Sequence, residues 1–175
     1  MPVAYLALGA NVGNRHRNLM LAVESLDALF GVLAVSSLYR SQAVVLEGAP
    51  PGPDYVNAAC AVVVDENDAG GLLQVVKKLE HTIGRRPAAR WAPRPIDIDI
   101  LLFGDAVLDT ETLTIPHPRM LERNFVLVPL AEIAPHVIHP VVHRAIRDLA
   151  REIGREGLER LYGPEWAPPG IPPRD

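Results

Sequence analysis

The chain has 175 residues, of which 49% are hydrophobic and 22% charged, and its formal net charge is -4. This composition is typical of one globular domain with a buried core, and its negative charge argues against broad nucleic-acid binding. No apolar run is long enough to span a membrane, and the single Cys60 excludes an internal disulfide. The N-terminus has no signal-peptide pattern, so we expect a cytoplasmic protein without nucleic-acid or membrane partners.

Apolar periodicity predicts a regular order of elements along the first two thirds of the chain. Strands are expected at residues 3–8, 32–40, 55–64 and 96–103. Amphipathic helices are expected after Asn14 and after either Asn67 or Asp68. Gly31 and Gly84 are expected to end these helices. This βαββαβ order is that of a ferredoxin-like α+β domain, here with added C-terminal elements.

The remaining segments are expected to complete a single domain over residues 1–162. Gly104 and Asp105 read as a tight hairpin turn into residues 106–108. Further helices are predicted at 125–133 and 142–155. From residue 163 the density of proline and glycine predicts a disordered tail over residues 163–175.

Asp97 and Asp99 are the strongest candidates for a functional site. They alternate with isoleucines, so in a strand both side chains point to one face, roughly 7 Å apart. Carboxylates this close repel one another, and Mg²⁺ binds one or two carboxylates while completing its shell with water and phosphate. Just upstream of the pair, the ten residues 85–94 include four arginines, Arg85, Arg86, Arg90 and Arg94. Carboxylates, Mg²⁺ and arginines together neutralise and position phosphate groups, which predicts phosphoryl-type transfer.

The segment Arg90–Leu101 resembles the signature of the 6-hydroxymethyl-7,8-dihydropterin pyrophosphokinase family. It has the basic residue, the Pro-Arg pair and the Asp-hydrophobic-Asp pattern of that signature. Other blocks match in the same order, namely Val3–Asn11, Ser37–Ser41, Asp54–Ala59, Leu113–Arg119 and Pro129–Pro135. The likeness extends to about Leu161, although the loop at 41–54 is longer than usual and the arginine loop is about one residue shorter.

The resemblance implies a folate-biosynthesis enzyme that transfers a pyrophosphoryl group from ATP to a pterin hydroxymethyl group and releases AMP. Asp97 and Asp99 would hold two Mg²⁺ ions, and Asp97 would also orient the hydroxyl. Arg94 would bind phosphate oxygens, while Arg85 or Arg86 would close over the triphosphate. The catalytic set implied is Arg85, Arg94, Asp97 and Asp99. Other residues implied on the ATP side are Glu80, Arg86, Arg90, Trp91, Ile100, Thr114, His117 and Arg123.

The pterin side is implied in the same way. Tyr55 and Phe125 would sandwich the ring, and Asn57 offers one acceptor and two donors to its amide edge. Ser41 would add a polar contact near that edge. The plain alternatives are core packing for both aromatic residues and a solvated helix charge for Glu80.

Other functions are compatible with the same carboxylate pair. A metal-dependent phosphohydrolase or a nucleotidyltransferase would use it on a different bond of the nucleotide. In a non-catalytic ferredoxin-like binding module the carboxylate pair would have no functional role. The expected partners are the small molecules ATP and a pterin, and a monomer is favoured.

Overall fold

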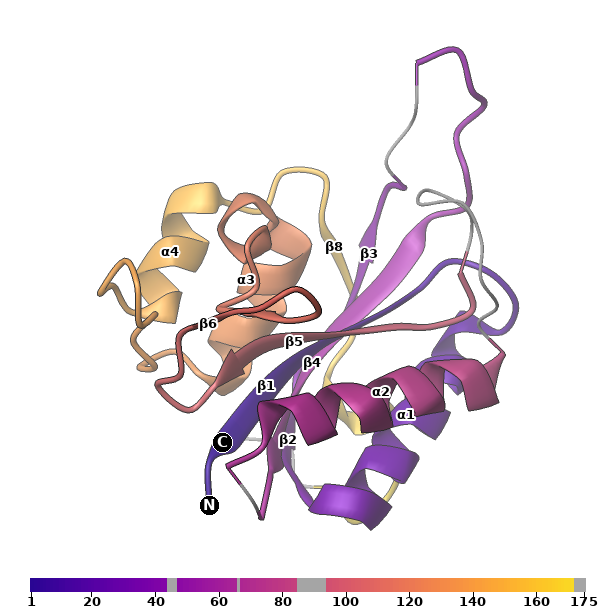
Figure 1. Ribbon diagram of the computed structural model, residues 1–175. Coiled ribbons are helices and arrows are strands. Elements are labelled where there is room, and N and C mark those ends of the chain that lie inside the picture. The colour runs from indigo at the N-terminus through magenta and orange to yellow at the C-terminus, as the bar shows by residue number, and fades with distance from the viewer. Residues whose placement is uncertain (44–46, 66, 85–93, 172–175) are drawn as a thin grey trace.

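In a computed structural model, which describes residues 1–43, 47–65, 67–84 and 94–171, the chain forms a mixed α/β fold. An antiparallel sheet carries helices on both faces (Figure 1). The elements in chain order are β1 (Val3–Ala10), α1 (Arg15–Phe30), β2 (Val32–Val35), β3 (Leu38–Ser41), β4 (Tyr55–Val63), α2 (Ala69–Ile83), β5 (Asp97–Phe103), β6 (Leu108–Asp109), β7 (Thr114–Ile115), η1 (Met120–Glu122), α3 (Asn124–Ile133), α4 (Ile146–Ile153), β8 (Glu159–Tyr162) and η2 (Pro164–Trp166).

In the main sheet β1 lies between β5 and β4. The strand order is β5-β1-β4-β3-β8, with β2 beside β4, and every pairing is antiparallel. In this register Gly9 of β1 lies opposite Asn57 of β4 on one side and opposite Asp97 of β5 on the other. Residues directly opposite one another share a face, so these three positions form a row at one end of the sheet.

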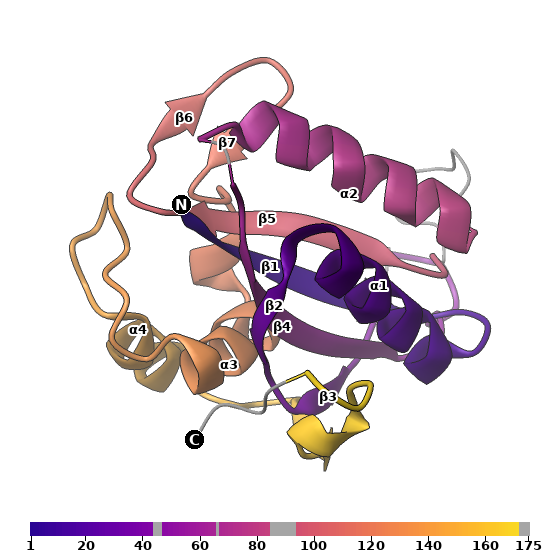
Figure 2. The ribbon, with the colours of Figure 1, turned by 90° about the horizontal axis from the view of Figure 1, so that it is seen from below.

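The two faces of the sheet bury separate apolar cores. On one face Leu6, Leu8 and Ile98 pack with residues of α1 and α2. On the other, Ala59 and Leu102 pack with residues of α3 and α4. Figure 2 shows α1 and α2 together on one side of the sheet and α3 and α4 on the other. None of the helices that the structure describes is long and apolar enough to cross a membrane.

The predicted ends of α1 and α2 are confirmed. The side chain of Asn14 accepts a hydrogen bond from the backbone N–H of Arg17, and that of Asp68 does the same for Gly71. These contacts satisfy donors that a helix start leaves without partners. Gly31, with φ of 81°, follows the last residue of α1.

The single strand expected at 32–40 is two strands, β2 and β3. Between them the Ser36 hydroxyl donates to the Ser37 carbonyl and accepts from the backbone N–H of Ala59. These side-chain bonds replace the regular ladder at this point and break the strand.

The hairpin expected after β5 is also wrong, because β6 pairs with β7 in a separate small sheet. The outer edge of β5 is occupied in another way. The backbone N–H of Ile98 donates to Glu80, and the carbonyl of Leu101 accepts from the backbone N–H of His117. A strand following the turn therefore finds this edge already paired.

The last predicted helix is shorter than residues 142–155. Residues 139–144 form a turn in which Nδ1 of His139 accepts from the backbone N–H groups of Val141 and Val142, and His143 has a φ of 55°. This left-handed backbone is incompatible with a continuous right-handed helix, so α4 begins only at Ile146.

The predicted disorder of the tail is wrong for residues 163–171. Trp166 is 5% exposed, Ile171 is 9% exposed, and both belong to the core beneath α1. The indole Nε1–H of Trp166 donates to the carbonyl of Ser36 at 2.7 Å. Composition predicted disorder, but a single large aromatic side chain anchors the segment. The predicted disorder at 172–175 lies outside the described residues.

We expect Trp166→Ala to lower the free energy of unfolding by about 3 kcal/mol, because it removes a buried aromatic side chain and a buried hydrogen bond. Urea unfolding followed by circular dichroism measures this loss. The exposed neighbour Glu165 is the control, and Glu165→Ala should change stability by no more than about 0.5 kcal/mol. Equal small effects of both substitutions would show that the tail is not part of the core.

Candidate active site

Asp97 and Asp99 lie on one face of β5, as the alternation of the sequence predicts. Their side chains are 28% and 30% exposed, whereas Ile98 and Ile100 on the opposite face are buried. Asp97 lies opposite Gly9 and Asp99 lies opposite Ala7, so the neighbouring β1 positions have minimal side chains. The two carboxylates therefore project beyond the small side chains of the neighbouring strand at this end of the sheet.

The carboxylate pair is electrostatically unfavourable without a further cation. Burial, and then the charge of Asp97, raise the pKa of Asp99 to about 6, against the opposing effects of Lys77 and Arg123. Among the described residues there is no group of three or more His, Cys, Asp or Glu side chains that could hold a metal ion. A paired carboxylate site of this kind fits Mg²⁺, which takes its other ligands from water and phosphate.

Arg94 and His117 approach this pair from two loops. Nη1 of Arg94 is 3.5 Å from Oδ1 of Asp97, and Nε2 of His117 is 4.0 Å from Oδ2 of Asp99. Arg123, just before α3, lies close enough to act electrostatically on both carboxylates. The predicted residues Arg94, His117 and Arg123 are therefore brought together around Asp97 and Asp99.

His117 is a neutral hydrogen-bond donor in this arrangement. Burial, and then the positive charge of Arg123, lower its pKa to about 4. Nδ1 accepts from the backbone N–H of Arg119 at 3.2 Å, which leaves the proton of the neutral ring on Nε2. The Nε2–H side faces Asp99, where it can donate to a carboxylate or a phosphate oxygen.

Glu80 is a buried residue, so its alternative as a solvated helix charge is wrong. It is 2% exposed, and its Oε1 accepts from the backbone N–H of Ile98 at 3.1 Å and from Nζ of Lys77 at 3.2 Å. Ile98 separates the two aspartates, so Glu80 fixes β5 at the carboxylate pair.

Asn11 is a site residue that the sequence interpretation missed. Its Oδ1 accepts from the backbone N–H of Arg94 at 2.7 Å, and its own N–H donates to the Arg94 carbonyl at 3.0 Å. Its Nδ2 donates to the carbonyl of Pro53 at 3.4 Å. The turn after β1 therefore holds both Arg94 and the end of the long loop. In the sequence Asn11 belongs to the Gly/Asn turn at residues 9–14, which is interpreted as a turn that borders the pterin pocket, without a role for Asn11 itself.

A second group of predicted residues lies on β3 and β4, across β1 from the carboxylates. The buried Asn57 donates from Nδ2 to Oγ of Ser41. A Cβ placed on Gly9 would lie 3.6 Å from Oδ1 of Asn57 and 3.6 Å from the ring of Tyr55. Ser41, Tyr55 and Asn57 are therefore neighbours, separated from Asp97 only by the width of one strand.

Phe125 and Arg123 contact each other at the start of α3. Phe125 lies in the first turn of α3, and the Arg123 guanidinium carbon is 5.7 Å from the centre of its ring. Thr114 is on β7, where its hydroxyl donates to Asp109 across the small sheet. Ile100 is buried in β5 beyond the aspartates.

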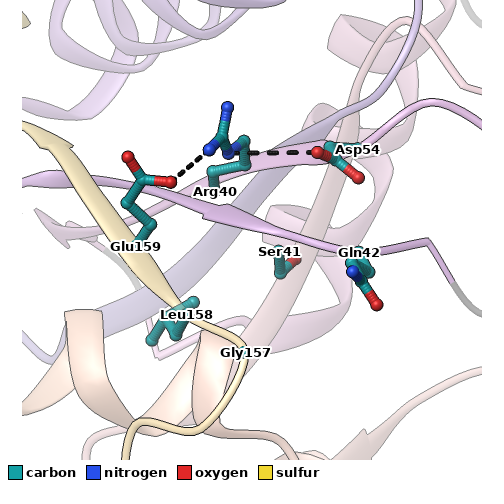
Figure 3. A pocket seen from close by; sticks show the side chains of 7 residues that line it. All are labelled: Arg40, Ser41, Gln42, Asp54, Gly157, Leu158 and Glu159. Atoms are coloured by element: carbon teal, nitrogen blue, oxygen red, sulfur yellow. Dashed lines mark hydrogen bonds and ion pairs between the residues drawn. The ribbon is translucent and has the colours of Figure 1, made fainter.

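A cavity of about 350 Å³ adjoins the Asn57 side of the site. It is lined by Arg40, Ser41, Gln42, Asp54, Gly157, Leu158 and Glu159 (Figure 3). Arg40 lies between Glu159 and Asp54 and pairs with both carboxylates. Neither Asp97 nor Asp99 lines this cavity, so the chemistry of the carboxylates identifies the site better than the size of the cavity does.

Arg85, Arg86, Arg90 and Trp91 lie outside the described residues. The roles that the sequence indicates for them stay predictions.

Two kinds of comparison place the chain among known proteins. A family model described as 7,8-dihydro-6-hydroxymethylpterin-pyrophosphokinase (HPPK) matches residues 5–135. The chain belongs to this family. It is 36% identical over 152 residues to the 2-amino-4-hydroxy-6-hydroxymethyldihydropteridine pyrophosphokinase of Aquifex aeolicus, covering 87% of this chain and 92% of that one. With its namesake from Bacillus subtilis it shares 42% identity over 137 residues, covering 77% and 80%.

Solved structures show the same fold. A wild-type Plasmodium falciparum HPPK-DHPS crystal structure superposes with a TM-score of 0.71 at 18% identity, covering 92% of this chain and 44% of that one. The chain thus spans less than half the length of that relative.

Membership of the HPPK family confirms the enzyme class that the sequence predicts, an ATP-dependent pyrophosphokinase. Family membership favours a pyrophosphokinase over a phosphohydrolase, a nucleotidyltransferase or a non-catalytic binding module. The matched residues include both aspartates and the flanking Arg94, His117 and Arg123.

We expect Asp99→Asn to stabilise the metal-free protein near neutral pH. The pKa of Asp99 is about 6 in the fold, above its ordinary value of about 3.9, so its stabilising protonation is complete below about pH 4 and is lost as the pH rises through 6. The variant should melt about 2–4 °C higher than wild type at pH 7.5 with chelator present. Its advantage should shrink at pH 5.

The control is Asp105→Asn, in an exposed turn. It should shift the melting temperature equally at both pH values. A pH-independent effect of Asp99→Asn would contradict the raised pKa of Asp99.

Proposed function

We propose that this HPPK-family enzyme transfers the pyrophosphoryl group of ATP to the hydroxymethyl group of a 2-amino-4-hydroxy-6-hydroxymethyldihydropteridine, a step of folate biosynthesis. One observation carries the proposal. Asp97, Gly9 and Asn57 occupy one row across three strands, so a phosphate-binding group and a pterin-binding group face each other over a residue without a side chain. A substrate bound at Asn57 can present its hydroxyl to phosphate bound at the aspartates.

The reaction exchanges one phosphorus–oxygen bond for another and releases the hydroxyl proton to solvent. The pterin hydroxyl oxygen attacks the β-phosphorus of ATP, the bond from that phosphorus to the α,β-bridging oxygen breaks, and AMP leaves. Asp97 accepts a hydrogen bond from the attacking hydroxyl and orients it. Such a reaction depends on positioning and charge stabilisation rather than on a covalent intermediate.

Asp97 and Asp99 hold two Mg²⁺ ions in this proposal. When bound, the ions neutralise the triphosphate and stabilise the charge on the leaving oxygen. The raised pKa of Asp99 supports the assignment, because a bound cation offsets both the burial of the carboxylate charge and the repulsion from Asp97 that raise it.

The cations around the pair bind the phosphate chain. Arg94 is held by Asn11 and extends to Asp97, so it is placed to donate to phosphate oxygens. His117 donates from Nε2, and Arg123 adds positive charge next to Asp99. The ATP contacts assigned to Glu80, Thr114 and Ile100, and those of Arg85, Arg86, Arg90 and Trp91, belong to the proposal on family resemblance.

The pterin ring lies between Tyr55 and Phe125, with its amide edge at Asn57 and Ser41. Phe125 lies in the first turn of α3, on the face of the sheet where Asn57 lies, and Tyr55 begins β4 two residues before Asn57. A planar heterocycle placed between two aromatic rings gains favourable stacking.

The finer architectural assignments are part of the same proposal. The core is ferredoxin-like, and the spatial order β5-β1-β4-β3 with α1 and α2 on one face supports this. In this assignment β2 and β3 together take the place of one strand. We propose a cytoplasmic monomer whose single domain has its boundary near residue 162, with residues 163–171 packed against it.

The direct test of the function is product analysis. Purified protein with ATP, Mg²⁺ and 6-hydroxymethyl-7,8-dihydropterin should release AMP in equal amount to the pyrophosphorylated pterin. ADP with a monophosphorylated pterin, or free pyrophosphate with an adenylylated pterin, would contradict the proposal.

We expect Asp97→Ala, Asp99→Ala and Arg94→Ala to lower the turnover number at least a hundredfold, because the aspartates hold the ions that neutralise phosphate and Arg94 binds phosphate oxygens. The measurement is AMP release, with circular dichroism to establish folding. Arg151→Ala is the matched control for a lost arginine, since its side chain is 79% exposed on α4. Near-normal turnover of a folded Asp97→Ala or Asp99→Ala would refute the metal assignment.

A further inference from the structure

We propose that the first turn of α1 positions one residue of each substrate-binding group, through Asn18 on the phosphate side and Arg15 on the pterin side. Asn18 fixes the segment that carries Arg94, and Arg15 fixes the segment that leads into Tyr55. Neither side chain contacts a substrate in the proposed reaction, so both are positioning residues. The inference rests on the proposed function and deepens it, because it names what holds these two binding residues in place.

Asn18 holds the backbone next to Arg94. Its Nδ2 donates to the carbonyl of Pro95 at 3.0 Å, across 77 positions of the sequence. Proline has no backbone N–H, so this carbonyl is the only polar backbone group that Pro95 offers. Asn11 binds both the N–H and the carbonyl of Arg94. Together the two asparagines bind every polar backbone group of Arg94 and Pro95, and the arginine side chain extends from this fixed backbone to Asp97.

Arg15 holds the backbone next to Tyr55 in the same way. Its Nη1 donates to the carbonyl of Asp54 at 2.6 Å, and this carbonyl belongs to the peptide unit that also contains the nitrogen of Tyr55. A guanidinium group only donates, so it suits a carbonyl. The Asp54 carboxylate lies 3.9 Å from Nε of Arg40. The last residue before β4 is therefore fixed through both its backbone and its side chain, and Tyr55 begins the strand from there.

Both contacts come from one side of a helix start that is itself anchored. Residues three positions apart are neighbours on a helix surface, so Arg15 and Asn18 lie close together on α1. The side chain of Asn14 caps this turn, and the N–H of Asn18 donates to the carbonyl of Asn14 at 2.9 Å. Leu19, the next residue, is fully buried in the core between α1 and the sheet. A capped turn that is packed against the core is a rigid support for the two segments.

The two contacts act on different substrates. In the proposed reaction Arg94 binds phosphate oxygens, whereas Tyr55 stacks on the pterin ring. Loss of the Asn18 contact should therefore weaken nucleotide binding, and loss of the Arg15 contact should weaken pterin binding. If the turn only stabilised the fold, either substitution would affect both ligands alike.

The test on the phosphate side is a double-mutant cycle. Calorimetry in the presence of Mg²⁺ measures the affinity for a non-hydrolysable ATP analogue. Asn18→Ala should weaken this affinity about fivefold, the loss expected for one hydrogen bond. In an Arg94→Ala background the same substitution should have less than about a twofold effect, because Asn18 acts through Arg94. Alanine is the best helix former, so the variants should fold, and circular dichroism checks this.

The test on the pterin side separates hydrogen bonding from charge. With Mg²⁺ and a saturating ATP analogue present, calorimetry measures the affinity for 6-hydroxymethyl-7,8-dihydropterin. Arg15→Ala should weaken it about fivefold, whereas Arg15→Lys, which keeps the charge and a donor, should stay within about twofold of wild type. The matched control is Arg17→Ala, which removes an exposed arginine from the same turn and should change neither affinity by more than about twofold.

The pattern of losses decides the inference. Asn18→Ala should leave the pterin affinity, and Arg15→Ala the nucleotide affinity, within about twofold of wild type. Equal weakening of both ligands by either variant, an undiminished effect of Asn18→Ala in the Arg94→Ala background, or no effect of either substitution would overturn the positioning roles while AMP release by wild type still stands. Failure of the wild-type protein to bind the pterin at all would overturn both the positioning roles and the proposed function.

Discussion

The antiparallel register of β1 between β4 and β5 is the constraint on which the site depends. Successive side chains of a strand point to opposite faces, so a shift of one residue would turn every side chain over. In the observed register Ile98 and Ile100 enter the core beneath α1 and α2 while Asp97 and Asp99 stand on the other face. The same register places Asn57 in the row of Asp97. Core packing therefore fixes the distance between the proposed phosphate-binding and pterin-binding residues, without help from a loop.

The carboxylate pair opposes folding, and its surroundings offset part of the cost. Arg94, Lys77 and Arg123 each act favourably on one or both carboxylates, while His117 is neutral. Burial and mutual repulsion still leave the pKa of Asp99 above its ordinary value. Shifted pKa values of this kind are typical of functional sites, because the metal ions that bind with the substrate supply the positive charge that the carboxylates lack. The raised pKa and the proposed metal binding thus have one cause.

Local periodicity predicted the parts of the fold that depend on local preference. The alternation at residues 96–100 correctly predicts which side of β5 is buried, and glycines 31 and 84 end the helices as expected. The failures depend on partners distant in sequence. The break at Ser36 needs the backbone of Ala59, and the order of the tail depends on a cavity for Trp166 formed by residues far upstream.

The same distinction applies to the site. Residue type and spacing indicated Asp97, Asp99 and Arg94, because these charged residues lie close together in one short segment of the sequence. Asn11 and the buried carboxylate of Glu80 act on backbone groups, and such roles depend on strand edges that only the folded chain reveals. The orientation of the Asn57 amide likewise depends on the carbonyl of Tyr39, to which no side-chain pattern points.

The central claim, that one row of the sheet joins a metal–phosphate site to a pterin site, can be tested directly by anomalous diffraction. Crystals grown with Mn²⁺, a non-hydrolysable ATP analogue and 6-hydroxymethyl-7,8-dihydropterin would be measured for the anomalous signal of manganese. We predict manganese peaks coordinated by the carboxylates of Asp97 and Asp99, with the pterin hydroxyl beside Asp97 and its amino edge at Oδ1 of Asn57. Manganese and nucleotide bound elsewhere, with these two carboxylates uncoordinated, would contradict the account.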